Sequence, residues 1–371
     1  MKAPHRRRDA QAQAHRAVVS SVRLCAFFVF VACGSSKPIE YPTADFPIPT
    51  DTILTPYVNV PVGTWLGGTR WVVVSSDAAE AAVVDFASKS KLVLGGKKAG
   101  QTEIRNPVTV FVSNDTIWVT DWSLGRATLW TGSGQPAGIV ASPPELRGAL
   151  PYARDAAGQL YYEIRPNAGR DGSGNRDSAA IVRQVPVPAR FDTVGKLSPF
   201  DLAEVQDAAG RRFERRVFSG VDRWGVLRDG SLWMARVYPN YVMWRDPSGK
   251  ELKGVDLPDR VIEVTMTDRD QFIQQFPEEL RSTAEGLPFS PLKPPFENAL
   301  TAPSGFVWLE KSRPVIDSTR SYHLIDRRGA LTRVLVLPSR QGHVIAVGDT
   351  LVLVAEQWRK GVRLMQVRIP R

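Results

Sequence analysis

A short unit that returns six times along the chain constrains the fold more than any other feature of the sequence. Each copy begins with Gly or Asp, continues through two residues, and ends on an aromatic or β-branched residue that starts a run typical of a β-strand. We call these last residues the anchors, and they are Trp71, Trp118, Tyr161, Trp233, Trp308 and Val352. The gaps between them are 47, 43, 72, 75 and 44 residues. Because a period of about 40 to 50 residues with four short strands is typical of a β-propeller blade, the sequence predicts an all-β, six-bladed propeller, with a β-sandwich or two stacked barrels as the alternative.

The end of the chain bears on this prediction, because only 19 residues follow the last anchor. Together with the run before the anchor, they supply three strands, at about 344–347, 351–356 and 362–369. The sixth blade therefore lacks a fourth strand. Residues 52–60 lie before the first blade, and we expect them to supply this strand, close the ring and remove an exposed strand edge. The propeller is predicted to span residues 51–371.

The first residues have the features of an export signal. An apolar run at 24–32 follows a stretch rich in Arg, and as a helix it would span about 14 Å, against about 30 Å for a bilayer core. Such a run fits the core of a signal peptide. The segment that ends it, Phe30-Val31-Ala32-Cys33, resembles the lipobox of bacterial lipoproteins. We therefore expect residues 1–32 to be a signal peptide, with a plain secretory signal or a membrane anchor as the alternative.

A lipid on Cys33 would account for the use of cysteine in this chain. There are two Cys, and Cys25 would leave with the signal peptide, so the folded part would hold no disulfide. Residues 33–50, rich in Pro, Ser and Thr, are expected to form a tether. We expect a protein of the cell envelope that meets the membrane through its lipid anchor only. Because Gly34 follows the Cys, the expected location in a bacterium with two membranes is the outer membrane, on its periplasmic or surface face.

The net charge of +10 gives little support for nucleic-acid binding. Half of this charge lies in residues 1–32, and the rest is spread over the remaining chain. The run Arg211–Arg216 is basic, but it is short and is interrupted by Phe213 and Glu214. We therefore expect no nucleic-acid partner, and we expect a monomer.

Three stretches are longer than a regular blade needs: residues 165–178, 198–216 and 259–298. In a blade of strands A to D, an anchor at the start of B places the B–C loops and the D-to-A connections on one face, so all three stretches are expected there. Within the last stretch, residues 268–285 have a helical pattern, with Asp268 as the expected cap and Pro277 separating two short helices. Long loops gathered on one face favour a role in function.

The B–C loops also carry mixed charges and aromatic rings, which suit the recognition of a polar partner. The candidate binding residues are Asp77, Asp121, Trp122, Arg165, Arg236, Tyr238, Glu310, Lys311, Glu356 and Trp358. The expected partner is an envelope protein, a peptide or a glycan. Taken singly, each of these residues is also consistent with an ordinary solvated loop position.

No set of catalytic residues is recognisable. After the predicted signal peptide the chain has two His, His323 and His343, too few for a zinc site of several His and expected to be structural. Oxygen-bearing side chains alternate, as in calcium loops, at Asp171, Ser173, Asn175 and Asp177. The position of the closing Glu is occupied by Val182, so we expect no cofactor, with calcium as the alternative.

Three stretches of the sequence carry a resemblance to a known group of propellers. They are Asp229–Trp233, 294–308 and Leu324–Leu331. Through them, residues 50–371 resemble the six-bladed propellers of the NHL/TolB-like superfamily, in particular bacterial lipoproteins of uncharacterised function. This resemblance implies the fold but no particular activity. Related hydrolases hold Ca²⁺ in the central channel, yet no Asn–Asp set recurs at the inner-strand positions of this chain. The leading expectation is a binding module, and the alternatives are a calcium-dependent hydrolase or lactonase and an architectural part of an envelope complex.

Overall fold

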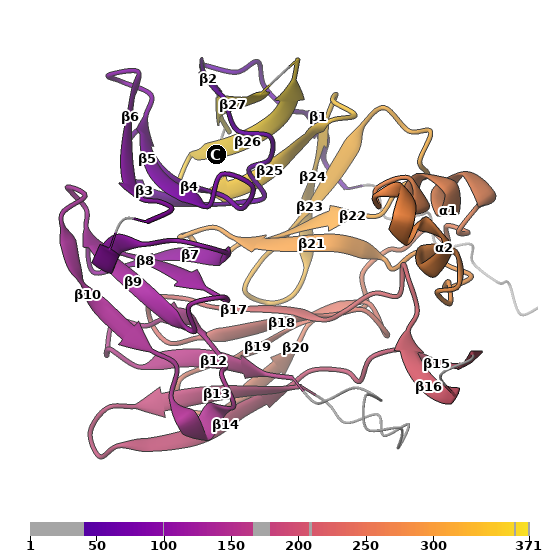
Figure 1. The fold of residues 1–371 in the computed structure, drawn as a ribbon, viewed down its shortest axis with the longest axis horizontal. Helices are drawn as coiled ribbons and strands as arrows, with labels where there is room; N and C mark the ends of the chain where they lie inside the picture. The colour runs from indigo at the N-terminus through magenta and orange to yellow at the C-terminus, as the bar shows by residue number, and fades with distance from the viewer. Residues whose placement is uncertain (1–40, 99, 166–178, 208–209, 360, 370–371) are drawn as a thin grey trace, which may run out of the picture. The chain divides into compact units, whose positions relative to one another are not determined.

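Six antiparallel sheets of four strands, the blades, follow one another around a ring (Figure 1). The computed structural model describes residues 41–98, 100–165, 179–207, 210–359 and 361–369. The predicted signal peptide, Cys33 and the calcium-like stretch 171–177 lie outside these residues. Among the helices in the described ranges, none is both long and apolar enough to cross a bilayer.

The first three blades use twelve consecutive strands. They are β3 (Val62–Gly67), β4 (Arg70–Ser75), β5 (Glu80–Asp85) and β6 (Ser90–Gly95) in blade 1; β7 (Pro107–Ser113), β8 (Thr116–Asp121), β9 (Arg126–Thr131) and β10 (Pro136–Ala141) in blade 2; and β11 (Pro151–Arg154), β12 (Leu160–Ile164), β13 (Ala180–Val185) and β14 (Arg190–Lys196) in blade 3. Short 3-10 turns at Gly100–Thr102 and Pro144–Leu146 lie in the connections between them.

The last three blades follow the same plan. They are β17 (Arg223–Val226), β18 (Leu232–Arg236), β19 (Tyr241–Arg245) and β20 (Glu251–Lys253) in blade 4; β21 (Phe296–Thr301), β22 (Val307–Lys311), β23 (Arg320–Ile325) and β24 (Leu331–Leu337) in blade 5; and β25 (Gly342–Val347), β26 (Leu351–Trp358) and β27 (Gly361–Arg368) in blade 6. The prediction of an all-β, six-bladed propeller is confirmed.

The fourth strand of blade 6 comes from the N-terminal side of the chain. Strand β2 (Asp51–Thr55) pairs antiparallel with β27, from Asp51 opposite Gln366 to Thr55 opposite Val362. The inner strands β3, β7, β11, β17, β21 and β25 each contact the next around the ring, and β25 contacts β3. The ring therefore closes between the last blade and the first.

The predicted tether is too long at its C-terminal end. Strand β1 (Thr43–Asp45) pairs in parallel with β24 and becomes a fifth strand of blade 5. Phe46, next in the chain, packs edge-on against Trp308 and Tyr322. The Pro and Thr content suggested a free linker, but the buried ring of Phe46 holds this segment to the propeller.

The anchors lie where the repeat places them. Each is the second or third residue of the second strand of its blade, and none is more than 5% exposed. Trp71 packs with Leu353 and Leu364 of blade 6, and Trp233 packs with Leu309 of blade 5. The anchors therefore fill the space between neighbouring blades, and burial of such large apolar side chains stabilises the ring by about 2–3 kcal/mol each.

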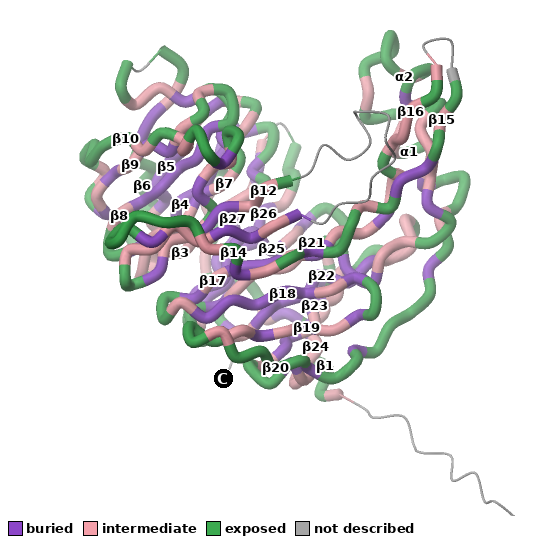
Figure 2. Tube along the Cα trace, turned by 90° about the horizontal axis from the view of Figure 1, so that it is seen from below, coloured by how far each residue is buried: buried purple, intermediate pink, exposed green. Residues whose placement is uncertain are grey.

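Two of the long stretches have regular structure of their own. Residues 198–216 contain a hairpin of β15 (Leu202–Asp207) and β16 (Gly210–Arg215), and 259–298 contains α1 (Met266–Ile273) and α2 (Glu278–Glu285). The two stretches lie on the same side of the propeller in both views (Figures 1 and 2). Phe218, just after the hairpin, packs against Phe272 of α1 and against Phe289 beyond α2. They form one raised wall, and we call the face that carries it the insertion-bearing face.

The helical prediction is confirmed, with one correction at its start. Pro277 immediately precedes α2 and so separates the two helices. Asp268 is not the cap of α1. Thr265 is the cap, and Asp268 is the third helical residue, whose carboxylate accepts hydrogen bonds from the backbone N–H and the hydroxyl of Thr265. This is a capping box, in which the two residues satisfy each other's exposed donors.

Candidate functional site

Two of the predicted binding residues are carboxylates that hold loops in place. The side chain of Asp121 is buried and accepts backbone N–H bonds from Arg105 (2.7 Å), Asn106 (2.9 Å) and Leu124 (3.0 Å). Asp77 accepts from the backbone of Val58 and Asn59, both at 3.1 Å. Desolvation raises the pKa of Asp77, but these bonds and one from the Ser75 hydroxyl outweigh it and leave the pKa lowered. Both carboxylates tie a B–C turn to the chain segment beside it.

Three more of the predicted residues are engaged in ion pairs. Glu310 is 5% exposed and pairs with Arg320, and burial raises its pKa more than Arg320 lowers it. Lys311 is 8% exposed, and burial lowers its pKa although Asp259 lies 3.5 Å from its Nζ. Glu356 accepts from the Ser339 hydroxyl at 2.6 Å and pairs with Arg363. These charges are already neutralised within the fold.

The exposed members of the predicted set are Arg165 and three aromatic residues. Trp122 and Tyr238 are 65% and 64% exposed. Trp358 is 39% exposed, and the guanidinium carbon of Arg363 lies 4.1 Å from its ring centre. Exposed rings of this size are costly to leave in water and are available for stacking or apolar contacts with a ligand.

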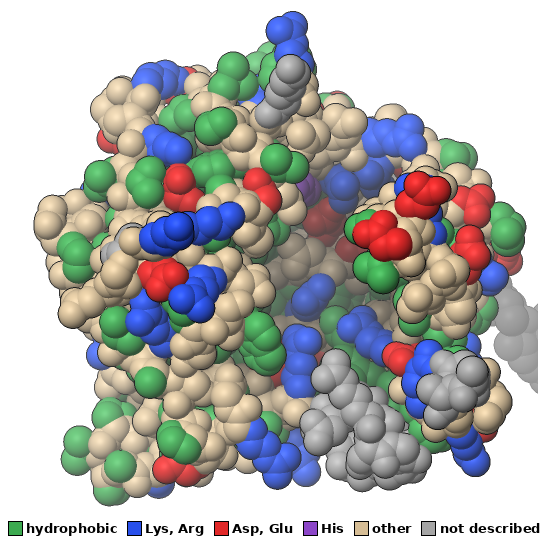
Figure 3. Space-filling view, viewed as in Figure 1, with side chains coloured by type: hydrophobic (Ala, Val, Ile, Leu, Met, Phe, Trp, Pro, Cys, Tyr) green, Lys and Arg blue, Asp and Glu red, His purple; other side chains and the backbone are tan. Residues whose placement is uncertain are grey.

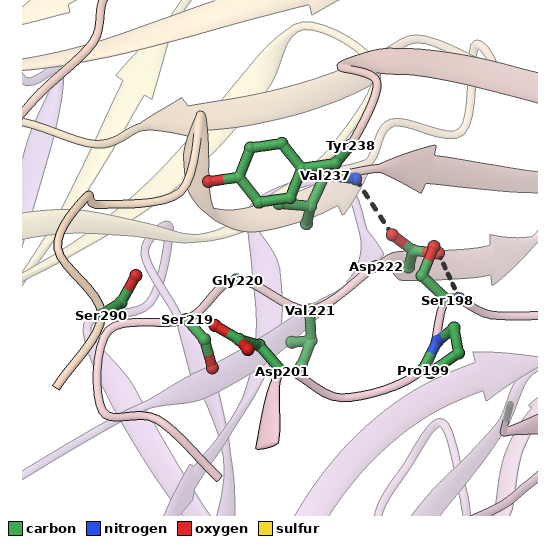
Figure 4. A pocket seen from close by; sticks show the side chains of 10 residues that line it. All are labelled: Ser198, Pro199, Asp201, Ser219, Gly220, Val221, Asp222, Val237, Tyr238 and Ser290. Atoms are coloured by element: carbon green, nitrogen blue, oxygen red, sulfur yellow. Dashed lines mark hydrogen bonds between the residues drawn. The ribbon is translucent and has the colours of Figure 1, made fainter. Parts of the chain in front are cut away.

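A polar cavity of about 80 Å³ lies where the two inserted stretches meet the B–C loop of blade 4 (Figure 4). Its lining residues are Ser198, Pro199, Asp201, Ser219, Gly220, Val221, Asp222, Val237, Tyr238 and Ser290. Because the connections from blades 3 and 4 and the loop after β18 all contribute, residues far apart in the sequence converge here. Its serine hydroxyls and the Asp201 carboxylate can hydrogen-bond to a small group, and Pro199, Val221 and Val237 offer apolar contacts.

Asp222 organises one wall of this cavity. Its side chain is fully buried and accepts backbone N–H bonds from Ser198 (2.7 Å) and Val237 (3.0 Å), the bonds drawn in Figure 4. It also pairs with Arg236 at 2.7 Å. Arg236 was predicted as a binding residue, but the structure makes it the partner of a buried carboxylate that positions the Tyr238 loop.

Three inner strands have a β-bulge at their start. The ladder register shifts in β7, β11 and β21 at the second residue, which leaves Val108, Tyr152 and Glu297 outside the regular pairing. Val108 and Tyr152 are 44% and 43% exposed, and the Glu297 side chain is 43% exposed. Bulges at such positions commonly re-aim side chains near functional sites. Since the inserted stretches lead into β17 and β21, the starts of the inner strands lie on the insertion-bearing face.

Three arginines form a cluster beside Tyr152, which we call the Arg223 cluster: Arg165, Arg215 and Arg223. The surrounding protein lowers the pKa of Arg215, and the like charges of Arg165 and Arg223 lower it further. Protein also surrounds the half-exposed ring of Tyr152, and this desolvation raises its pKa. The cluster therefore sits in a concave part of the surface, where side chains are enclosed yet reach solvent.

A second group, the Arg320 cluster, adjoins the first: Arg313, Arg320 and Arg340. Arg313 and Arg320 both donate to the backbone carbonyl of Arg340, at 3.0 and 3.5 Å. Glu297 links the groups, since Arg223 donates to its carbonyl at 3.0 Å and Arg320 lies 3.9 Å from its carboxylate. Figure 3 shows a hollow near the centre of this face, with Lys and Arg side chains gathered in and around it. Of these arginines, the sequence predicted only Arg165 as a binding residue, because the others come from a hairpin, loops and strand ends that share no spacing in the sequence.

The two histidines lie in strands of blades 5 and 6. Burial lowers the pKa of His323 and of His343 to about 4, with added effects from Lys311 and Arg320 respectively. Both imidazoles are therefore neutral at pH 7. Among the described residues, no group of three or more His, Cys, Asp or Glu converges as metal ligands.

Comparison with known proteins gives relatives in structure only. No protein-family model and no curated protein matches the sequence. A member of the DUF4221 family from Bacteroides vulgatus has a TM-score of 0.52, with 8% identity over 86% of this chain and 96% of the other. A putative exported protein from Bacteroides fragilis has a TM-score of 0.49, with 10% identity over 89% of this chain and 99% of the other. Regucalcin from Agrobacterium tumefaciens, a calcium-binding protein, has a TM-score of 0.43, with 10% identity over 89% and 98%. At such identities the likeness establishes the fold alone, so the chain is similar to these proteins as a six-bladed β-propeller.

Proposed function

We propose that this protein is a lipid-anchored, extracytoplasmic binding module whose insertion-bearing face receives a peptide, a glycan or another protein. One observation carries the proposal: the inserted stretches, the polar cavity and the hollow with its arginines all occupy the same face of the ring. A propeller needs none of these to be stable. Loops that a rigid scaffold holds together are the usual place for recognition.

The contact residues we assign are the exposed ones, Trp122, Tyr238 and Trp358. Trp122 and Tyr238 lie on B–C loops, and Trp358 is the last residue of β26, where it leads into such a loop. The rings offer large rigid surfaces that lose little conformational freedom on binding. The buried carboxylates Asp121 and Asp222 act as positioning residues, because they fix the loops that carry Trp122 and Tyr238. Recognition in this scheme needs no catalytic group.

Binding can be measured with the purified full chain on arrays of peptides and of glycans, followed by titration of the ligands found. We expect Trp122→Ala and Tyr238→Ala to weaken a ligand by tenfold or more, since removal of a central aromatic contact costs about 2 kcal/mol. The matched control is Phe191→Ala, which removes an exposed ring on the outer strand β14. If the control weakens binding as much as the other two variants do, the insertion-bearing face is the wrong one.

The lipid anchor needs its own test. Cys33→Ser should abolish incorporation of labelled fatty acid and move the protein from the membrane fraction to the soluble fraction. Retention of both in the variant would show that another segment holds the chain.

A further inference from the structure

We infer that the Arg223 cluster binds an oxyanion, a carboxylate or phosphate group, which the ligand of this face carries. The inference rests on the proposed function and specifies the chemistry of the ligand. On one side, Arg215 donates to Ser219, which lines the cavity. On the other, Arg165 is linked through Glu163 and Trp224 to Tyr152 at the start of blade 3.

Two of the three cations have no carboxylate partner among the described residues. Arg215 donates to the carbonyl of Ser219 at 2.9 Å and to its hydroxyl at 3.4 Å. Within the same ranges, Arg223 donates to the carbonyl of Glu297, and its buried Nε has no partner. Arg165 forms an ion pair with Glu163. Arg215 and Arg223 therefore have donors available for a ligand.

Three cations are also brought together here without a matching number of carboxylates in the described part of the chain. Burial lowers the pKa of Arg215 most, and the like charges of Arg165 and Arg223 lower it further. Like charges in an enclosed part of the surface repel more strongly than in open water. Stability alone would not bring three such side chains together, whereas an oxyanion among them would replace repulsion with attraction. The planar guanidinium fork matches carboxylate and phosphate oxygens in particular.

The residues around the Arg223 cluster offer contacts for the rest of a ligand. The ring of Tyr152 packs 4.8 Å from that of Trp224, and the indole N–H of Trp224 donates to Glu163 at 2.7 Å. Glu163 in turn pairs with Arg165, so ring and cation are held in one network. On the other side, Ser219 connects Arg215 to the cavity. A group attached to the oxyanion would meet either an aromatic platform or a polar cavity.

The Arg320 cluster is less suited to this role. Arg320 is already paired with Glu310, and Arg313 gives its donors to the carbonyls of Asp317, Thr319 and Arg340. The buried Nε of Arg320 has no partner, but the carboxylate of Glu310 already balances the charge of this arginine.

The test is calorimetric titration of the full chain in detergent with inorganic phosphate, citrate and glucose 6-phosphate, at constant ionic strength set with chloride. We expect saturable binding of at least one anion, weakened about tenfold or more by Arg215→Gln, which can still donate to Ser219. Without anion, this variant should melt no lower than the parent, because it relieves repulsion. If Arg215 stabilised the fold, Arg215→Gln would instead melt at a lower temperature than the parent. Arg165→Gln, at an exposed side chain, repeats the test if Arg215→Gln does not fold.

The control is Arg328→Gln, which removes an 82% exposed arginine side chain on the C–D turn of blade 5, at the opposite face. It should bind like the parent. Tighter binding of glucose 6-phosphate than of phosphate would place the oxyanion on a larger ligand, and equal binding would indicate a free anion. The inference falls if no anion binds saturably, or if Arg215→Gln binds like the parent. If it falls while Trp122→Ala and Tyr238→Ala still abolish binding of an array ligand, the proposed function stands and only the ligand class is wrong.

Discussion

Single buried carboxylates decide how the insertion-bearing face is arranged. Asp121 and Asp222 each accept two backbone N–H bonds from loop segments and one further bond, from Leu124 and Arg236 respectively. A carboxylate can satisfy several donors at once, which a loop cannot do through its own short-range backbone bonds. Asp121 and Arg236, which the sequence suggested as ligand contacts, therefore support the loops that carry Trp122 and Tyr238.

Asp222→Ala should destabilise the protein strongly. The change leaves the Ser198 and Val237 N–H groups unpaired and strands the charge of Arg236, whose side chain is 16% exposed, so we expect a loss of about 3 kcal/mol in the free energy of unfolding. Urea denaturation measures it. Asp256→Ala is the control in the same blade region, because that side chain is 73% exposed and lies 3.6 Å from Lys253, so a change below about 0.5 kcal/mol is expected. Equal midpoints for the two variants would contradict the role of Asp222.

At the scale of elements, the helical insertion combines a buried ion pair of its own with backbone hydrogen bonds to Val217 and a small aromatic group. Asp268 pairs with Lys293, and the two side chains are 3% and 8% exposed. Burial raises the pKa of Asp268, but the bonds from Lys293 and Thr265 lower it by more. The resulting stabilisation is complete above the ordinary carboxyl pKa and is lost only as the pH falls through the lower value of the folded state.

Asp268→Asn should loosen the insertion while the blades stay intact. The amide cannot balance the buried Lys293 charge, so amide hydrogen exchange should speed up across 265–293 and remain slow in the blade strands. Asp270→Asn alters an exposed residue of the same helix and should leave exchange unchanged. Uniformly faster exchange in all six blades would mean that the insertion and the propeller unfold as one unit.

At the scale of the whole propeller, stability depends on the seam where β2 meets β27. Gly361 begins β27, and a Cβ atom built there would lie 2.2 Å from the carbonyl oxygen of Thr55. This distance is far shorter than any normal contact. Because the Thr55 oxygen belongs to the backbone, a change of rotamer cannot relieve the clash. The seam is therefore packed against a position that tolerates only glycine.

Gly361→Ala should weaken closure. We expect a loss of about 1–3 kcal/mol in the free energy of unfolding, together with greater association of the chain as the β27 edge becomes available. Gly96→Ala is the matched control, since its Cβ would have only the Ala79 carbonyl oxygen nearby, at 3.9 Å. Denaturation measures the stability and light scattering measures the association. The prediction is wrong if Gly361→Ala behaves like the parent, as Gly96→Ala is expected to do.

The repeat predicted the fold because packing between blades needs a large residue at one fixed place. The six anchors occupy this place, and the small number of strands after Val352 indicated that the last blade lacked a fourth strand.

The candidate site was harder to predict, because the sequence does not show which partner a charged residue has. Glu310 and Arg236 look like free charges until Arg320 and Asp222 are placed beside them, and Arg223 becomes notable only beside Arg215. The two ion pairs form between neighbouring segments of one blade, 10 and 14 residues apart, and no helical or strand period brings residues at these separations together.

The N-terminal segment also sets how the protein would carry a mechanical load. A pull on the N-terminal side enters the fold at β1, which pairs with blade 5, and reaches β2 on blade 6 only afterwards. Phe46, locked between Trp308 and Tyr322, lies between the two strands along the chain. Under the proposed lipid anchor, tension from the membrane side would have to detach β1 and extract this ring before it reached the closing seam.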